Sequence, residues 1–428
     1  MYFLIIFFFL VVLGIPISFS IGMSSLAVLY IAGRESISHL IPQVLFTSLD
    51  TFPYLAIPGF ILAGELMNYT GITDEIIDFL DKIVGHISGG LAHINILASI
   101  LFAGLTGAAV SDTSALGSVL IPMMSEAGYD KKFSAAITAA SSIIGPIIPP
   151  SIIMVIYSLT AGNVSIGTMF IAGIAPGLLI GIILMIMVVY YSKKRNYPKN
   201  EERATAKDMF LATIKAFKAL LMPIIIIGGI LAGVFTATEA AIVSVMYAFF
   251  IGFVVTKQLK ISQLPEIFTH SAVVTSVVGM LISFAYVMGR VLTMQRIPQA
   301  IAETFTHYID TPLMFLFVMV AIYMVMGLFL DPSAALVVIV PIVLPIAMQY
   351  GIHPLHFGII TIVALNLGLI TPPVGVCLYV ACSIGDIKLD KLSKEVIPFL
   401  FFEIFVLLML VIFPELVLFI PRLVGLIS

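Results

Sequence analysis

Apolar residues along this 428-residue chain gather in long blocks, and polar residues are confined to the stretches between them. A bilayer core about 30 Å thick takes about 20 apolar residues per helical span. The pattern therefore predicts an all-α polytopic membrane protein, in which residues 1–31 form either one tilted span or two pieces split near Pro16. The blocks fall at residues 1–31, 52–68, 88–125, 132–160, 168–192, 209–233, 236–256, 270–295, 312–349, 355–384 and 396–421.

Two of the blocks are too long for one span and too short for two. Residues 88–125 contain TGAAVSDTSALGS, and residues 312–349 contain LDPSAALV. A helix that enters, breaks at small and polar residues and leaves on the same side fits both blocks. Such backbone is tolerated where protein or water, rather than lipid, meets the freed polar groups. The pattern predicts two re-entrant helical hairpins.

Two other blocks are interrupted in the middle of an apolar helix, by GPIIPPS at residues 145–151 and by GLITPPVG at residues 368–375. Proline removes a backbone donor and unwinds a helix. Each break thus frees carbonyl groups for a cation and exposes a half-helix N-terminus that can face an anion. One such pair of prolines would indicate a plain kink, but two at matched positions favour a binding site.

The two interrupted regions align without a gap when the sequence is shifted by 223 residues. An odd number of predicted crossings separates the two copies, so the second copy is inverted relative to the first. Inverted repeats with broken helices are the architecture of secondary transporters. The matched positions include Gly104 and Gly327, Pro122 and Pro345, Gly128 and Gly351, Gly145 and Gly368, Pro149 and Pro372, Pro150 and Pro373, and Gly162 and Gly385.

Basic residues place one end of each span. The hydrophilic stretch SKKRNYPKNEERATAK, residues 192–207, is rich in Lys and Arg, and the positive-inside rule makes it cytoplasmic. Counting spans outward from this loop brings the other basic clusters to the same side. These are Lys131 and Lys132, Lys257 and Lys260, and Lys388, Lys391 and Lys394.

Composition agrees with a membrane protein and excludes several other classes. The chain is 61% hydrophobic and 10% charged, with a mean hydropathy of +1.19, whereas soluble domains carry about a quarter charged residues. Its net charge of −3 and the lack of a basic patch argue against nucleic-acid binding. Cys377 and Cys382 are interpreted as packing residues. The N-terminal block has no signal-peptide pattern and is interpreted as retained.

Four motifs resemble those of a known family: PGFILAGELMNYTGIT (58–73), GPIIPPS, VFTATEAA (234–241) and LNLGLITPPVG. Together they resemble the large membrane subunit, of the DctM or SiaM type, of TRAP transporters, over essentially the whole chain. One departure is Ala237, where the family pattern suggests proline. The stretch from LDPSAALV to residue 360 is most similar to the sialic acid branch.

The resemblance implies a sodium-driven importer of a carboxylate solute, N-acetylneuraminate (sialic acid) first, in a bacterial inner membrane. It implies two protein partners, a small four-helix membrane subunit and a periplasmic substrate-binding protein, and an elevator mechanism. The expected division is residues 1–87 and 161–311 as scaffold, 88–160 and 312–386 as the two repeats of the transport unit, and 387–428 as a C-terminal helix.

Ionisable and polar residues at membrane depth are costly and are usually functional. Asp331, at the second hairpin tip, is expected to contact substrate or to cap a helix. Sodium prefers several oxygen ligands, which hydroxyls and unwound carbonyls supply. The expected substrate residues are Asp331, Ser111, Ser151 and Asn366. Sodium is expected near Ser111, Asp112, Thr113, Ser114, Gly145, Pro149, Gly327, Gly368, Thr371 and Pro372.

Other polar residues are assigned to the scaffold or to the membrane interface. Glu65 and Glu239 lie outside the hairpins and breaks, which favours a scaffold role. Arg34 or Arg290 could meet a carboxylate, but an arginine near a span end is more typical of a headgroup anchor.

Two function classes compete with the tripartite transporter. A self-sufficient sodium/dicarboxylate transporter of related fold would need no binding protein, and the residues alone do not separate the two. An intramembrane enzyme is disfavoured because the sequence has no HExxH or GxGD motif. A channel is disfavoured because paired hairpins provide gates rather than an open pore.

Overall fold

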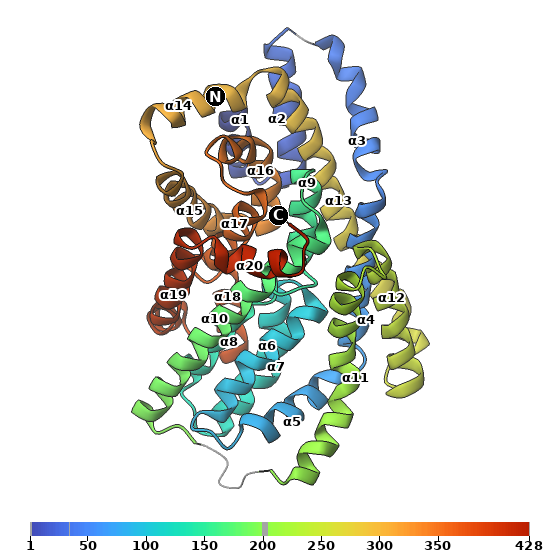
Figure 1. Ribbon diagram of the computed structural model, residues 1–428, viewed down its shortest axis with the longest axis vertical. Coiled ribbons are helices and arrows are strands. Elements are labelled where there is room, and N and C mark those ends of the chain that lie inside the picture. Colours follow the sequence, from blue (N-terminus) through green and yellow to red (C-terminus); the bar gives the residue numbers. More distant parts are fainter. Residues whose placement is uncertain (1, 34, 199–203, 428) are drawn as a thin grey trace.

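The computed structural model describes residues 2–33, 35–198 and 204–427, and all its regular elements are helical (Figure 1). Arg34 and residues 199–203 of the basic loop lie outside the described residues. The elements are α1 (Tyr2–Val12), α2 (Ile17–Ile31), η1 (Glu35–Leu40), α3 (Ile41–Leu49), η2 (Phe52–Leu55), α4 (Ala56–Asn68), α5 (Ile72–Val84), α6 (Gly90–Thr106), α7 (Ala109–Glu126), α8 (Lys131–Ser142), α9 (Ile152–Ala161), α10 (Ile166–Arg195), α11 (Ala206–Leu231), α12 (Ala237–Phe250), η3 (Ile251–Val255), η4 (Ile261–Gln263), α13 (Leu264–Met294), α14 (Ile297–Tyr308), α15 (Pro312–Phe329), α16 (Pro332–Gln349), α17 (Pro354–Gly368), α18 (Val376–Gly385), α19 (Leu389–Ile412) and α20 (Glu415–Leu423).

Many of these helices have the length and composition of membrane spans. Among the described residues, seven are long and apolar enough to cross, or eight if a pair bent by 60° counts as one span. That pair joins residues 38–49 to residues 52–68, so the block predicted at 52–68 has a helical extension upstream. The first apolar block is two short helices, α1 and α2, with Pro16 at the start of the second.

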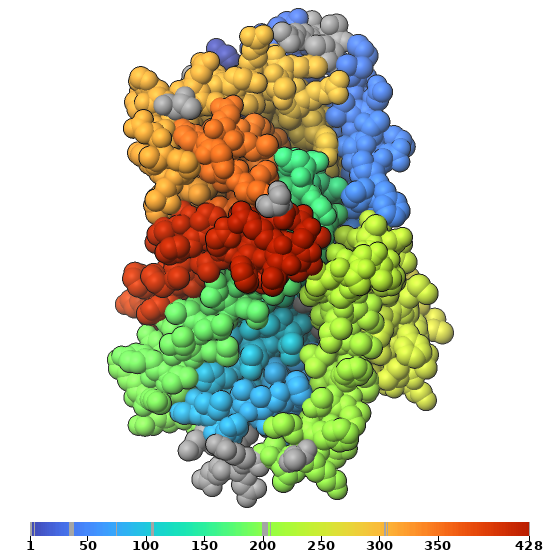
Figure 2. All heavy atoms as spheres, in the orientation of Figure 1, coloured from blue at the N-terminus to red at the C-terminus, as the bar shows by residue number. Residues whose placement is uncertain are grey.

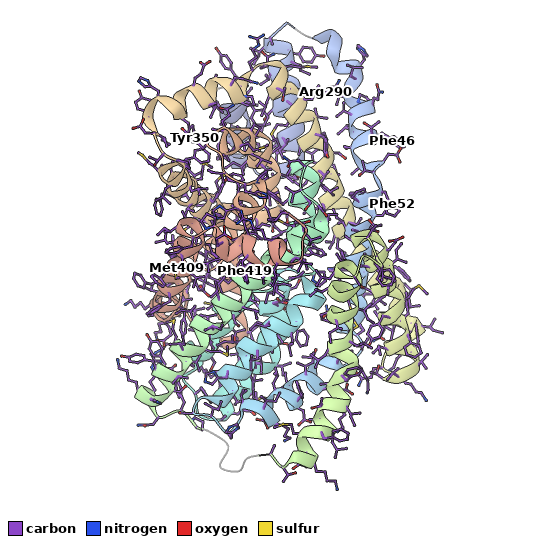
Figure 3. All side chains as sticks on the ribbon, viewed as in Figure 1. Phe46, Phe52, Arg290, Tyr350, Met409 and Phe419 are labelled. Carbon is purple, nitrogen blue, oxygen red and sulfur yellow. The ribbon has the colours of Figure 1, made fainter. Side chains whose placement is uncertain are left out.

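The outer surface carries large apolar side chains, as a lipid-facing surface requires. Phe46, Phe52 and Phe419 are examples, with exposed fractions of 72%, 57% and 61% (Figure 3). In water such a surface would aggregate, whereas in a bilayer it meets hydrocarbon.

The predicted repeat is present in the helices themselves. Shifting α7 by 223 residues gives the bounds of α16, and the same shift brings α8 onto the start of α17 and α9 to within one residue of α18. It also relates α4 to the second half of α13 and α10 to α19. The Pro149–Pro150 and Pro372–Pro373 peptide bonds are both cis.

Both long blocks are re-entrant hairpins, as predicted. Gly89 and Tyr129 flank the first, and both donate hydrogen bonds to the carbonyl of Pro198, at 3.3 and 3.2 Å. The two ends of α6–α7 therefore lie together beside the basic loop. In the second hairpin the Tyr350 hydroxyl donates to the Ile309 carbonyl at 2.9 Å, which brings the two ends of α15–α16 together.

The two hairpins open on opposite sides. Helix α8 starts beside the basic loop, and the far half of its broken span, α9, reaches the opening of the second hairpin, where the Tyr157 hydroxyl donates to the Pro354 carbonyl at 2.5 Å. The second broken span runs the other way. A methyl group on Gly385, at the end of α18, would lie 3.7 Å from Ala135 of α8. This arrangement is an inverted repeat.

The two repeats interlock, because α18 packs against α7 and α8 of the first copy and α9 packs against α16 of the second. A second group of helices forms the other side of the molecule, where α12 packs along α4 and α13 packs along α2, α3 and α4. Close approach there uses small residues: a methyl group on Gly59 would lie only 2.8 Å from Cβ of Ala241. Helices α19 and α20, red in Figure 2, cross the middle of the face shown.

Candidate transport site

The first break lies against the tip of the first hairpin. Helix α8 ends at Ser142 and α9 begins after Ser151, whose side chain accepts from the backbone N–H of Met154 and donates to the carbonyl of Pro146 at 2.6 Å. At the hairpin tip Gly107 has a φ of +62°, and a methyl group there would lie 3.1 Å from the Pro150 carbonyl oxygen. Ser151 thus holds the unwound segment closed, and its side chain is buried in this structure.

A buried polar cluster joins this break to α7. The carboxylate of Asp112 lies against Gly145, at the place where a larger residue would put its Cβ. Beside it the Thr113 hydroxyl donates to the Ser142 hydroxyl at 2.7 Å, and Cys377, from the second repeat, is within hydrogen-bonding reach of both. Asp112 and Thr113 are fully buried. A buried acid at membrane depth is costly, which makes Asp112 a candidate for a functional role.

Earlier on α8, two hydroxyl groups bond to amide and hydroxyl groups of the first hairpin. The Asn95 amide donates to the Thr138 hydroxyl at 2.7 Å, and the Ser99 hydroxyl donates to the Ser141 hydroxyl at 2.9 Å. Ser141 in turn donates to the Asn95 carbonyl oxygen at 3.1 Å. None of these four residues was expected at the site from the sequence. The available signal was an asparagine within an otherwise apolar stretch, 43 residues before the threonine it meets.

The second break is closed by backbone contact instead. A methyl group on Gly327 would overlap the Leu365 carbonyl oxygen and lie 3.0 Å from Cα of Gly368. Helices α15 and α17 therefore touch through glycine alone at this level. The Thr371 hydroxyl donates to the Leu367 carbonyl at 2.7 Å and ties down the start of the unwound segment, residues 369–375.

Asn366 is the strongest candidate for an ion contact at the second break. Its amide nitrogen donates to the Ile362 carbonyl at 2.8 Å, but its buried side-chain oxygen has no hydrogen-bond partner in the described structure. A buried acceptor without a donor costs about 1–3 kcal/mol. A bound cation would satisfy that oxygen.

Apart from Asp331, the predicted residues are thus divided among three places. Asp112, Thr113 and Gly145 come together at the first break, with Pro149 buried nearby in the same segment. Gly327, Gly368, Asn366, Thr371 and Pro372 belong to the second break. Ser111 and Ser114 are exposed and line a separate cavity of about 440 Å³ on the other face of α7.

Asp331 lies apart from the break residues in this structure. It is exposed, and its carboxylate caps α16 by accepting from the Ser333 N–H at 2.9 Å. Among the described residues its carboxylate accepts no hydrogen bond from the second break. The capping role expected from the sequence is present, and its exposure leaves the carboxylate open to a solute.

The donor chemistry at the breaks fits a hard cation such as sodium. The first break offers carboxylate and hydroxyl oxygens, and the second offers an amide oxygen and unwound carbonyls. Within the described ranges no three His, Cys, Asp or Glu side chains gather as a transition-metal site would require.

Comparison with known proteins gives the family. The sequence profile of the DctM component of the tripartite ATP-independent periplasmic transporters matches residues 4–416. This chain belongs to the DctM family. Such a member is a large permease of a TRAP transporter, and the expectation drawn from the four motifs is confirmed.

Two relatives show how far this family assignment reaches. The DctM-family chain is 40% identical, over 96% of its length and 95% of the relative's, to the sialic acid TRAP transporter large permease SiaM of Vibrio cholerae. It is 36% identical, over 95% of its length and 94% of the relative's, to the C4-dicarboxylate TRAP transporter large permease DctM of Pseudomonas aeruginosa. The two relatives carry different substrates.

A solved structure supports the fold independently. The crystal structure of the Alcanivorax borkumensis YdaH transporter, described as having an unusual topology, superposes with a TM-score of 0.59. The match covers 89% of this chain and 88% of that one at 16% sequence identity. The all-α transporter fold of the DctM-family chain is thereby confirmed.

Proposed function

We propose that this large permease imports a carboxylate solute, N-acetylneuraminate in the first place, by coupling its movement to sodium entering the cell. The observation that carries the proposal is the pair of unwound segments, each closed against its own hairpin in inverted copies. Similarity to the Vibrio cholerae SiaM protein supports N-acetylneuraminate over a C4-dicarboxylate, because that relative is the more similar of the two.

Sodium ions bind at the two breaks in this proposal, and the solute binds between them. The buried carboxylate of Asp112 and the unsatisfied oxygen of Asn366 support one ion at each break. Sodium would order the hairpin tips and so raise the affinity for the anion; by linkage the anion raises the affinity for sodium equally. Asp331, at the open tip of the second hairpin, contacts the solute.

Movement follows an elevator mechanism in which residues 88–160 and 312–386 travel together. The interlocking of α18 with α7 and of α9 with α16 supports one moving body, because neither repeat can shift without the other. Helices α10 and α19 also pack against these helices, so we extend the moving body to include them. Helices α2–α4 and α11–α13 form the scaffold.

The other components follow from membership of a tripartite family. A small four-helix membrane subunit extends the scaffold, and a periplasmic binding protein delivers the solute. The chain lies in a bacterial inner membrane with the basic loop, residues 192–207, in the cytoplasm, which the clustering of Lys and Arg on one side supports.

Uptake into proteoliposomes tests this function. The chain is reconstituted with its small subunit, and labelled N-acetylneuraminate is supplied with and without an inward sodium gradient and with and without the binding protein. We expect uptake only when both are present. Uptake without the binding protein would favour the self-sufficient transporter. Uptake of succinate but not of N-acetylneuraminate would agree with the family assignment and show that the proposed solute is wrong.

A further inference from the structure

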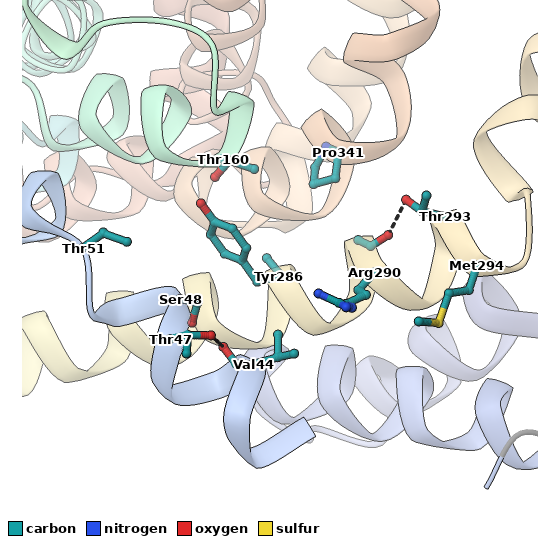
Figure 4. A pocket seen from close by; sticks show the side chains of 12 residues that line it. Val44, Thr47, Ser48, Thr51, Thr160, Tyr286, Arg290, Thr293, Met294 and Pro341 are labelled. Carbon is teal, nitrogen blue, oxygen red and sulfur yellow. Dashed lines mark hydrogen bonds between the residues drawn. The ribbon is translucent and has the colours of Figure 1, made fainter. Parts of the chain in front are cut away.

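Two cavities border related helices of the inverted repeats. One, of about 440 Å³, lies between α4 and α7. The other, of about 650 Å³, lies among α3, α9, α13 and α16 (Figure 4). The shift of 223 residues relates α4 to the second half of α13 and α7 to α16, so each cavity borders the corresponding helices of its own repeat, although their lining residues are not at matched positions.

The cavities face opposite sides of the membrane. Ser111 and Ser114, in the smaller cavity, lie on the stretch of α7 that leads toward the basic loop. Pro341, in the larger cavity, lies on the stretch of α16 that leads toward the opposite side. With the basic loop in the cytoplasm, the larger cavity is external and the smaller one internal.

Their charges have opposite signs. Among the described residues, Arg290 is the one charged residue that lines the external cavity, and Glu65 is the one that lines the internal cavity. The Glu65 carboxylate lies 3.4 Å from His270 Nδ1, on an exposed imidazole. Arg290, in contrast, forms no ion pair or hydrogen bond within the described structure, and its guanidinium points into the cavity (Figure 4).

The walls around Arg290 come from both bodies of the protein. Val44, Thr47 and Ser48 belong to α3, and the Tyr286 hydroxyl on α13 donates to the Leu159 carbonyl of α9 at 2.9 Å. A solute held at Arg290 would therefore touch the proposed scaffold and the proposed moving body together. A guanidinium offers five N–H donors in a planar fork that matches a carboxylate.

We propose that the external cavity receives the solute through a contact between Arg290 and its carboxylate, and that the internal cavity releases the solute because Glu65 repels the same group. This proposal rests on the proposed function. It adds the place at which the anion first binds. The opposite charges of the two cavities would hold an anion more tightly on the external side than on the internal side.

The test compares Arg290→Gln with Arg422→Gln. Arg422 pairs with Glu415 at the protein surface and contributes, after burial, to lowering the pKa of His353 beside the opening of the second hairpin. Arg422→Gln therefore removes one positive charge from the external side of the protein without changing a residue that lines the cavity. In sodium-driven uptake of N-acetylneuraminate we expect Arg290→Gln to raise KM about 10-fold or more, with Vmax little changed. Arg290→Lys recovers part of the loss, and Arg422→Gln keeps the wild-type KM.

A second readout asks whether Arg290 recognises the carboxylate itself. N-acetylneuraminate and its methyl ester are compared as inhibitors of uptake. The wild type prefers the acid, and Arg290→Gln loses that preference. The proposal is overturned if Arg290→Gln prefers the acid over the ester as strongly as the wild type does. It is also overturned if the KM of Arg290→Gln equals that of the wild type.

Two further arms separate the possible failures. Calorimetric titration of the detergent-solubilised complex with N-acetylneuraminate needs no sodium gradient, so weaker binding by Arg290→Gln supports the proposal even if driven uptake fails in the wild type. Binding by neither protein, or equal binding by both, overturns it. A lipid phosphate could also occupy Arg290. If the effect of Arg290→Gln vanishes in liposomes without phosphatidylglycerol, a headgroup is the occupant and the proposal is wrong.

Discussion

The two hairpin-and-break pairs share one backbone plan and differ in what holds them together. In the first pair, hydroxyl and amide groups of α6 and α7 bond to α8. In the second pair, α15 and α17 meet through Gly327 and Gly368. The first-pair residues Asn95, Ser99, Thr113, Thr138, Ser141 and Ser142 have the counterparts Val318, Ile322, Leu336, Thr361, Ala364 and Leu365.

The two repeats also differ in the position and burial of their acidic residues. Asp112 is buried beside Gly145, and its counterpart in the second repeat is Ala335. Asp331 is exposed at the second hairpin tip, and its counterpart in the first is Ala108. Each repeat thus carries one acid near its tip, at a different depth. An inverted repeat fixes backbone geometry twice but leaves side-chain chemistry free to diverge, so the buried acid can serve an ion and the exposed one a solute.

The largest expected effect is on the exposed acid. Asp331→Ala is expected to abolish uptake, with a loss of at least about 30-fold, because the carboxylate no longer accepts charge-assisted hydrogen bonds from hydroxyl or N–H groups of the solute. Losing the helix cap costs about 1 kcal/mol, which leaves the protein folded and assembled. The measurement is uptake of labelled N-acetylneuraminate, with size-exclusion chromatography of the complex.

Asp331→Asn separates the two roles of this residue, because asparagine caps a helix about as well as aspartate but carries no charge. It should match the wild type in thermal stability and still lose uptake. Normal uptake by either variant would remove Asp331 from the site.

The buried acid is expected to affect sodium more than solute. Asp112→Asn keeps the size of the side chain and removes the charge, so the sodium concentration for half-maximal uptake should rise about 10-fold or more. The apparent affinity for N-acetylneuraminate, measured at saturating sodium, should change much less. If sodium dependence stays as in the wild type, the first break is not an ion site.

Glycine substitutions compare the two pairs directly. A methyl group at Gly368 would overlap the backbone of Gly327, which cannot move aside, so Gly368→Ala should lower the free energy of unfolding by about 1–3 kcal/mol. At the counterpart, Gly145→Ala would meet the side chain of Asp112, which can rotate. The midpoint temperature of thermal unfolding in detergent should therefore be lower for Gly368→Ala than for Gly145→Ala. The reverse order would show that the first pair is the more tightly packed.

Much of this fold was predictable because glycine and proline constrain the backbone locally. Pro149, Pro150, Pro372 and Pro373 interrupt apolar stretches in any tertiary context, so both breaks and the repeat follow from the sequence. The hairpins follow from block lengths. The helix α3 was missed because Thr47, Ser48 and Asp50 lower the hydrophobicity of its stretch.

The site was less predictable, because side-chain direction depends on packing. Ser111 and Ser114 flank Asp112 in the sequence, but the helical turn points them into another cavity. Asn95 and Thr138 meet only through the packing of α6 on α8. Arg290 fits a headgroup anchor by its position near a span end, yet it lines the external cavity. Spacing along one helix does not reveal these partners.

The smallest expected effect isolates the polar contacts of the first pair. Thr138 and Thr361 are counterparts, and each hydroxyl donates to a carbonyl four residues earlier in its own helix, at 2.8 Å. Thr138 also accepts from the Asn95 amide at 2.7 Å. Substitution by valine keeps shape and burial in both places, but only Thr138→Val removes the oxygen acceptor of the buried Asn95 amide and leaves it with the weaker Met124 sulfur at 3.8 Å. Hydrogen bonds between membrane helices average about 0.6 kcal/mol, with a maximum of about 1.7 kcal/mol.

Thr138→Val should therefore lower the free energy of unfolding by about 0.6–1.7 kcal/mol, and Thr361→Val by much less. Adding Asn95→Leu to each variant completes the comparison, since removing both partners of a buried hydrogen bond costs less than removing one. The double variant Asn95→Leu, Thr138→Val should recover part of the loss, whereas Asn95→Leu should add its full cost to Thr361→Val. Equal effects of the two threonine substitutions would mean that the hydroxyl and amide contacts do not hold the first hairpin to its break, and that packing alone holds both pairs.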